Sequence, residues 1–250
     1  MLESLKIRNM ELGVGKPKIC VPLTGSNPVD LLSEAEAAME KSIDLVEWRG
    51  DCFHNIHNLT EMERTAKILR QQMGEIPILF TCRTEDGRFS ISIPDYIELN
   101  KWMIATGCID LVDVELFMGD MVCRELVEYA HAHHVAVIIS NHEFEQTPDV
   151  DVMVQRMQSM RYLGADIPKI AVMPKNNRDV LKLLQATDTF NQWFGDCPII
   201  TMSMGKKGVI SRLCGEIFGS ALTFATVGKA SAPGQISVDE VETILDILHQ

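Results

Sequence analysis

The sequence predicts a (β/α)8 barrel of the TIM type, an α/β fold formed as a single domain over residues 1–250. Three observations support this prediction. Eight short runs rich in β-branched residues alternate with longer amphipathic stretches. These runs begin 24 to 34 residues apart, which is the length of one strand plus one crossover helix. No linker rich in Pro, Gly or Ser and no low-complexity tract divides the chain.

A doubly wound open sheet would show the same alternation of strands and helices. The sequence of the turn after the first strand distinguishes the two folds. A dinucleotide-binding sheet uses GxGxxG at that turn. Here the turn reads LTGSNP, from Leu23 to Pro28. The barrel is therefore favoured.

The predicted elements start with residues 1–16, which precede the first strand and are expected to form a plug or hairpin that caps the barrel floor. Each of the following strands is a short apolar run bounded by turn residues. The eight predicted strands begin at Lys18, Ile43, Pro77, Ile109, Val135, Pro168, Pro198 and Leu222.

Recognisable end signals support the helices between these strands. Asn27 followed by Pro28 is a typical N-cap and first residue of the first helix. Gly74 and Gly164 stand where later helices should stop, because glycine accepts the left-handed conformation of a helix C-terminus. Ser237 begins a capping box, with Glu three residues later, before the last helix.

Composition limits the possible partners and compartment. The chain has 46% hydrophobic and 23% charged residues, with a formal net charge of −12. Such a charge repels nucleic acid and anionic membranes, so we expect neither as a partner. No apolar run is long enough for a membrane span or a secretory signal, so a cytoplasmic protein is expected. The seven cysteines are odd in number and lack a CxxC pair, which predicts reduced, packed thiols.

Basic side chains stand at the carboxyl ends of several predicted strands, where barrel enzymes place their chemistry. Glu47 and Arg49 are two apart and share one side of a strand, while Trp48 faces the helix layer. Arg83 ends the third strand, and Arg212 follows the seventh. A buried guanidinium stays charged, so these arginines predict a site that holds a carboxylate.

Two acidic residues of the fourth strand, Asp113 and Glu115, also share one face. They can belong to the functional site, or they can form an internal ion network that holds the top of the barrel together. The pattern leaves both interpretations open.

His142 is the histidine whose position favours a function, because it directly follows an apolar strand at the catalytic edge. The remaining histidines lie near a helix end or in no constellation, and no metal-binding spacing is present. These are His54, His57, His131, His133, His134 and His249. We therefore expect no metal.

Lys169, in the segment DIPKIAVMP, is the most informative residue of the chain. A lysine in an otherwise apolar strand is costly to keep charged, and burial among cations favours a neutral amine that can attack a carbonyl carbon. The alternative is a lysine at the strand opening, with its ammonium in solvent below the barrel. The strand pattern alone does not separate these two placements.

Five segments together resemble the motif set of the type I 3-dehydroquinate dehydratase family. They are EWR at Glu47–Arg49, SNHEF around His142, DIPKIAVMP around Lys169, ITMSMGKKGVISRL around Arg212 and SAPGQIS from Ser231. The resemblance is collinear over nearly the whole chain. It implies a (β/α)8 barrel, usually a homodimer, that converts 3-dehydroquinate to 3-dehydroshikimate on the route to chorismate and the aromatic amino acids. It implies no cofactor.

The same resemblance implies residue roles. Lys169 would form an imine with the substrate ketone, and His142 would act as base and then acid. A protonated imine is a better electron sink than a ketone, which gives this chemistry an independent physical basis. The residues implied to contact substrate are Glu47, Arg49, Arg83, Arg212, Ser231 and Gln235.

The chain departs from the family pattern at two places. An acidic residue that contacts the histidine is expected shortly after Arg83, where the segment RTEDGRFS looks shortened. Glu85 is preferred for this role and Asp86 competes with it. Pro22 stands where a polar serine is common, so that substrate contact is expected to be missing.

Two other functions compete with this interpretation. A class I aldolase or transaldolase also uses a barrel lysine, but no glycine-rich phosphate cradle follows the last two strands. A non-catalytic barrel that senses a polyhydroxy acid is the alternative of a different class, and intact His142 and Lys169 argue against it.

Overall fold

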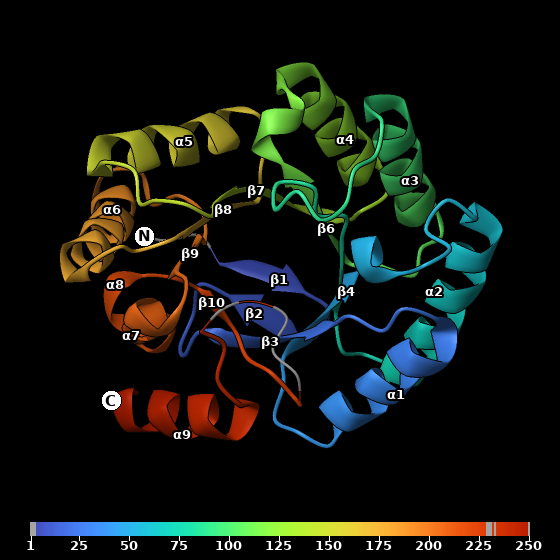
Figure 1. The fold of residues 1–250 in the computed structure, drawn as a ribbon, viewed down its shortest axis with the longest axis horizontal. Helices are drawn as coiled ribbons and strands as arrows, with labels where there is room; N and C mark the ends of the chain where they lie inside the picture. Colours follow the sequence, from blue (N-terminus) through green and yellow to red (C-terminus); the bar gives the residue numbers. More distant parts are fainter. Residues whose placement is uncertain (1–3, 229–231, 233, 250) are drawn as a thin grey trace.

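The computed structural model describes residues 4–228, 232 and 234–249, and it forms a closed parallel barrel (Figure 1). The strands pair in the order β10-β3-β4-β5-β6-β7-β8-β9. A parallel bridge between Ile199 and Ser220 joins the two ends of this order and closes the ring. The strands are β3 (Lys18–Leu23), β4 (Leu45–Arg49), β5 (Ile78–Thr81), β6 (Leu111–Glu115), β7 (Ala136–Glu143), β8 (Ile167–Val172), β9 (Ile200–Ser203) and β10 (Leu222–Phe224).

The eight predicted strands are confirmed, and each begins within two residues of its predicted start. Helices surround the barrel (Figure 1). Within the described residues, none of them combines the length and apolar character needed to cross a bilayer. They are α1 (Pro28–Met39), α2 (Leu59–Met73), α3 (Ile93–Ala105), α4 (Asp120–Ala132), α5 (Val150–Tyr162), α6 (Asn177–Phe194), α7 (Val209–Leu213), α8 (Gly215–Phe218) and α9 (Val238–Leu248).

The predicted helix ends are confirmed. The Asn27 side chain accepts hydrogen bonds from the backbone of residues 29 and 30 at the start of α1. Gly74 caps α2 with a φ of 56°, and Gly164 follows α5 with a φ of 100°. Ser237 and Glu240 form the expected capping box of α9. Local chemistry therefore determines where these helices begin and stop.

The apolar side chains form two separate clusters, one on each side of the sheet. The larger cluster lies between the strands and the helices. Trp48 belongs to it, as expected, and packs edge-on against Phe53 and Phe80, with ring centroids 5.8 and 5.7 Å apart. The smaller cluster fills the barrel interior. Alternation along each strand sends neighbouring side chains into different clusters.

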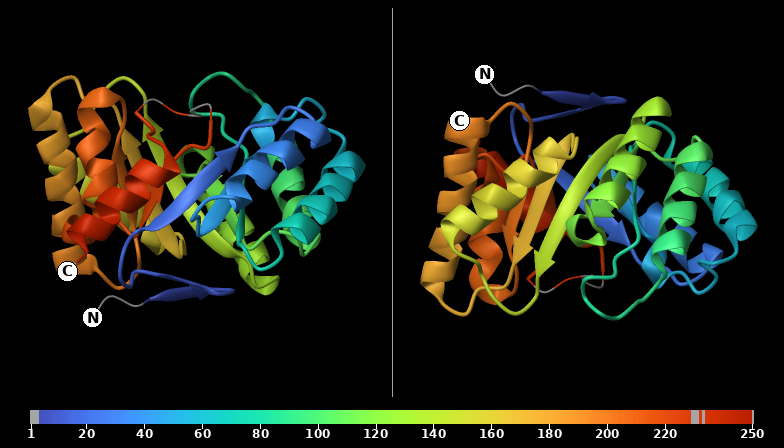
Figure 2. Two further views of the ribbon diagram at one scale, coloured as in Figure 1. Left: turned by 90° about the horizontal axis from the view of Figure 1, so that it is seen from below. Right: turned by 90° about the horizontal axis from the view of Figure 1, so that it is seen from above.

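A hairpin of β1 (Leu5–Ile7) and β2 (Met10–Leu12) closes one end of the barrel (Figure 2). Ile7, Met10 and Leu12 are buried in the interior cluster, together with the inward residues at the strand starts. The expected N-terminal cap on the barrel floor is thereby confirmed. The hairpin removes apolar surface from water at this end. The opposite end, at the carboxyl ends of the strands, stays open.

All seven cysteines are free thiols, in agreement with the sequence. Six are buried, and Cys52 is partly buried. Burial raises the pKa of Cys82 well above its ordinary value and raises that of Cys52 to about 11, which makes both poor nucleophiles at neutral pH. The thiols thus serve as small apolar side chains.

Candidate active site

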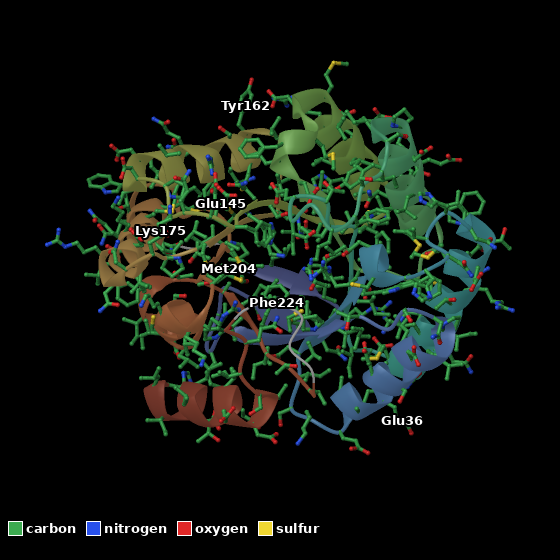
Figure 3. The ribbon with its side chains drawn as sticks, viewed as in Figure 1. Glu36, Glu145, Tyr162, Lys175, Met204 and Phe224 are labelled. Carbon is green, nitrogen blue, oxygen red and sulfur yellow. The ribbon has the colours of Figure 1, made fainter. Side chains whose placement is uncertain are left out.

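A cavity opens at the carboxyl ends of the strands, with about 570 Å³ of empty space when the part open to solvent is included. Among the side chains around it, Figure 3 labels Met204 and Phe224, which lie near the middle of the barrel. The residues around the cavity are Glu47, Arg49, Arg83, Asp86, Arg88, His142, Phe144, Lys169, Ala171, Met202, Met204, Arg212, Phe224, Ala232 and Gln235.

Lys169 points into the barrel because of its place in the alternation of β8. Ile167 and Ala171, two residues before and after it, belong to the interior cluster. Ile170 and Val172 belong instead to the cluster beneath the helices. Only 3% of Lys169 is exposed, so a lysine with its ammonium in solvent below the barrel is excluded.

The amine of Lys169 has two carboxylates and one ring as neighbours. Its Nζ lies 2.9 Å from Asp113 Oδ2, 3.9 Å from Glu47 Oε1 and 4.7 Å from the ring centroid of Phe224. The expectation of an amine among cations was therefore incomplete. Acidic residues of β4 and β6 thus face the same atom.

His142 ends β7 and is paired with a carboxylate. Its Nδ1 lies 2.8 Å from Glu85 Oε2, and its backbone N–H donates to the same oxygen over 2.9 Å. The ring stacks on Phe144 with centroids 5.9 Å apart. Burial, and then the charges of Arg83 and Lys169, hold the pKa of His142 well below its usual range. The ring is therefore neutral near pH 7 and can accept a proton.

Glu85, and not its competitor Asp86, contacts the histidine. Asp86 pairs instead with Arg88, over 2.6 Å. Burial raises the pKa of Glu85 to about 7, although Arg83 opposes this change. While Glu85 is ionised it can only accept, so Nδ1 carries the imidazole proton and Nε2 is left as the basic atom.

Arg83 is held by an internal ion network. It donates to Asp113 over 2.7 Å, and to Glu115 and Ser140 over 2.9 Å each. Although burial opposes ionisation, Arg83 and Lys169 keep the pKa of Asp113 below its usual range. Of the two interpretations left open for Asp113 and Glu115, the structure therefore shows the internal ion network. Asp113 also contacts Lys169, so the network includes the lysine.

The other basic residues of the cavity differ in their surroundings. Arg49 forms a two-point ion pair with Asp51, with distances of 2.9 and 2.7 Å. Arg212, on α7, is buried at the cavity wall, and burial lowers its pKa to about 10. Gln235 lines the same cavity, whereas Ser231 lies outside the described residues.

The structure thus brings most of the predicted site residues to one cavity, with Glu85 behind His142. The sequence reasoning missed the apolar part of the wall, which includes Phe144, Met202 and Phe224. Met202 and Phe224 occupy inward positions of their strands, so the alternation of β9 and β10 carried a signal for them. The sequence reasoning also missed Asp51, which lies after the end of β4, so strand alternation gives no signal for it.

No group of three or more His, Cys, Asp or Glu side chains among the described residues is arranged to hold a metal ion. Several charged residues of the cavity instead form ion pairs with nearby carboxylates, as Lys169 does with Asp113 and Arg49 with Asp51. The site is therefore best described by its lysine, its histidine–carboxylate pair and its arginines.

Fold and site together define an α/β barrel that carries a buried lysine and a histidine–carboxylate pair at the carboxyl ends of its strands, where barrel enzymes place their chemistry. The model of the type I 3-dehydroquinase family matches residues 19–250. The chain belongs to this family. The resemblance seen in the motifs is thereby confirmed, and the chain is a hydro-lyase of the dehydratase type.

Individual relatives match over the full length. A 3-dehydroquinate dehydratase of Clostridioides difficile (strain 630) is 50% identical, with 100% of this chain and 99% of the relative covered. One of Escherichia coli (strain 55989 / EAEC) is 48% identical, with both chains fully covered. The crystal structure of a type I 3-dehydroquinate dehydratase from Clostridium difficile, with covalent modified comenic acid, is 50% identical. Its TM-score is 0.97, and the match covers 100% of this chain and 99% of that one.

Proposed function

We propose that the chain removes water from 3-dehydroquinate to give 3-dehydroshikimate, through an imine between Lys169 and the substrate ketone. The observation that carries this proposal is a buried lysine in the same cavity as a neutral, carboxylate-bound His142. The names of the full-length relatives support the choice of substrate. We place the reaction on the route to chorismate and the aromatic amino acids.

The first step joins the amine to the substrate. The Nζ of Lys169 attacks the C3 carbonyl as a neutral amine. The neutral ring of His142 can take up the proton that the nitrogen releases, and this proton returns to the hydroxyl that then leaves as water. Loss of one water from the adduct then gives a protonated imine. Asp113, 2.9 Å from Nζ, stabilises the positive charge that remains on the nitrogen.

The second step is the elimination. The Nε2 atom of His142 removes a proton from C2, and the electron pair moves into the iminium to give an enamine. The enamine expels the C1 hydroxyl, which leaves as water after it takes the proton from His142. Hydrolysis of the conjugated imine consumes one water, releases the product and restores the amine. The net change is loss of one water, and the iminium serves as the electron sink without a cofactor.

Substrate binding is assigned to the polar wall of the cavity. Arg212 and Arg49 present guanidinium groups suited to a carboxylate, and Gln235 lies on the same wall. Glu47 and Arg83 line the cavity as well, and their contacts with the lysine and with Asp113 make them part of the charged frame around the reacting nitrogen. Ser231 is kept as a substrate contact on the family resemblance.

Borohydride trapping tests the proposal. The protein mixed with 3-dehydroquinate and sodium borohydride should carry ligand mass on the peptide that contains Lys169, because the hydride reduces the imine to a stable amine. Turnover without borohydride should yield 3-dehydroshikimate. Ligand binding with neither adduct nor turnover would overturn the proposal in favour of a barrel that only senses the acid.

The pH dependence of the reaction should report on Glu85. Below pH 7 this carboxylate takes up a proton, and the pair loses the negative charge that stabilises the imidazolium formed in the elimination. We therefore expect kcat/KM to fall as the pH decreases through about 7. In Glu85→Gln the side chain at position 85 can no longer titrate, so this fall of kcat/KM at low pH, the acid limb of the pH profile, should disappear. A limb that persists unchanged in Glu85→Gln would assign it to another group.

We also propose that residues 1–250 form one domain that works as a homodimer in the cytoplasm. The match of the family model to residues 19–250 without a break supports the single domain. The family resemblance supports the homodimer and the cytoplasmic location.

A further inference from the structure

A buried amide holds the Glu85–His142 pair from behind the cavity. Asn141 precedes His142 on β7, and only 1% of it is exposed. Its Nδ2 donates to Glu85 Oε1 over 3.2 Å, on the carboxylate oxygen that does not face the histidine. Its Oδ1 accepts a hydrogen bond from Arg156 over 2.7 Å. Neither Asn141 nor Arg156 lines the cavity.

Arg156 determines which way this amide points. A guanidinium has only donors, so the oxygen of Asn141 must face Arg156 and its NH2 group must face Glu85. Arg156 is itself held from other sides, because it donates to Glu143 over 2.7 Å and lies 5.3 Å from the ring centroid of Phe117. The amide is therefore fixed as a donor toward Glu85.

We propose that Asn141 and Arg156 are positioning residues of the dehydration reaction. Arg156 orients the amide of Asn141, and this amide holds Glu85 so that Oε2 stays against His142 Nδ1. The inference rests on the proposed function, since it assigns a role within the same acid–base pair. These hydrogen bonds lead from Arg156 on α5 to Asn141 on β7, then to Glu85 in the loop after β5, and end at Nδ1 of His142, on the opposite side of the ring from the basic Nε2.

The charged surroundings of Glu85 show why a neutral donor matters there. Arg83 faces it from the same loop, at 3.7 Å, and His142 faces it from β7. Burial is the largest influence and raises the pKa of Glu85, and Glu115 and Asp113, which approach from β6, raise it further. The hydrogen bond from Asn141 acts in the opposite direction. Loss of this donor should therefore favour the protonated carboxyl.

Asn141→Asp is the sharpest test, because it keeps the shape and the acceptor toward Arg156 but replaces the donor toward Glu85 with an acceptor. We expect kcat to fall about 10- to 100-fold, as when a group that orients a functional side chain is lost. KM should change by less than about 2-fold, since no substrate contact is removed. The acid limb of kcat/KM should move upward by about one pH unit.

Arg156→Met tests the second contact, the hydrogen bond from Arg156 to Asn141. It leaves the Asn141 amide free to turn, so the acid limb should move in the same direction by a smaller amount. Arg156→Lys keeps a donor and should restore part of the loss. Glu143→Gln is the matched control, because it removes the second partner of Arg156 and leaves the contact between Asn141 and Glu85 intact. It should show the wild-type acid limb.

The inference is overturned if Asn141→Asp folds and keeps the wild-type kcat and acid limb. It is equally overturned if Glu143→Gln moves the limb as far as Arg156→Met, since the effect would then come from packing of α5. If Asn141→Asp does not fold, the acid limb of Arg156→Met alone tests the inference, and an unchanged limb in that variant overturns it. Failure of the wild-type protein to form the borohydride adduct would overturn the proposed function instead.

Discussion

Replacement of Lys169 with alanine should abolish turnover and remove the borohydride adduct. Without the amine the substrate ketone has no path to an iminium, and the carbanion formed at C2 would lack its electron sink. We expect kcat to fall by about 10⁵-fold or more, the loss typical of a nucleophile that acts as part of a catalytic unit. The measurements are steady-state production of 3-dehydroshikimate and mass spectrometry of the trapped peptide.

Two further variants make this result specific. Lys169→Met keeps most of the side-chain volume above Asp113, so it separates loss of the amine from a packing defect. Lys175→Ala is the matched control, because Lys175 is an exposed lysine that does not line the cavity. Figure 3 labels it to the left of the barrel centre. This variant should keep full activity and the full adduct. An adduct that survives in Lys169→Ala would assign the imine to a different lysine.

His142→Ala should separate imine formation from elimination. The amine and its carboxylate partners remain, so borohydride should still trap ligand on Lys169. The C2 proton would have no base and the leaving hydroxyl no acid, and we expect kcat to fall about 10²- to 10⁴-fold, the usual contribution of a general acid–base group. Single-turnover trapping and the steady-state rate measure the two steps on the same variant.

The control for this variant is His133→Ala. His133 is an exposed histidine at the end of α4, where its Nδ1 contacts the backbone oxygen of Tyr129 over 2.8 Å. Its loss should leave the rate unchanged. Rapid dehydration by His142→Ala would remove His142 from the mechanism, and loss of both trapping and turnover would point to a collapsed cavity.

The strand pattern and the capping chemistry predicted the barrel well because both are local. Alternation along β8 places Lys169 on the inner side with Ile167 and Ala171, and it can be read from six consecutive residues. The caps at Asn27 and Ser237 depend on residues at most three positions away. The motif set added the chemistry that the pattern left open, since Lys169 could have faced either end of the barrel.

The electrostatic environment could not be predicted in the same way. Glu47, Asp113 and Lys169 come from three strands, and whether their side chains meet depends on how the strands are staggered around the ring. The same holds for Arg83, whose guanidinium is bound by Asp113 and Glu115. The expectation of a lysine among cations was incomplete for this reason.

The sequence by itself determined the eight strands, the helix ends, the cap on the barrel floor and the side of each strand that its residues occupy. Only the tertiary structure decided which charges meet: that Glu85 and not Asp86 holds His142, and that Asn141 links Glu85 to Arg156 on α5. The physical reason is range. Backbone alternation and capping act over a few residues, whereas ion pairs and hydrogen bonds between strands form only after closure of the barrel sets their register.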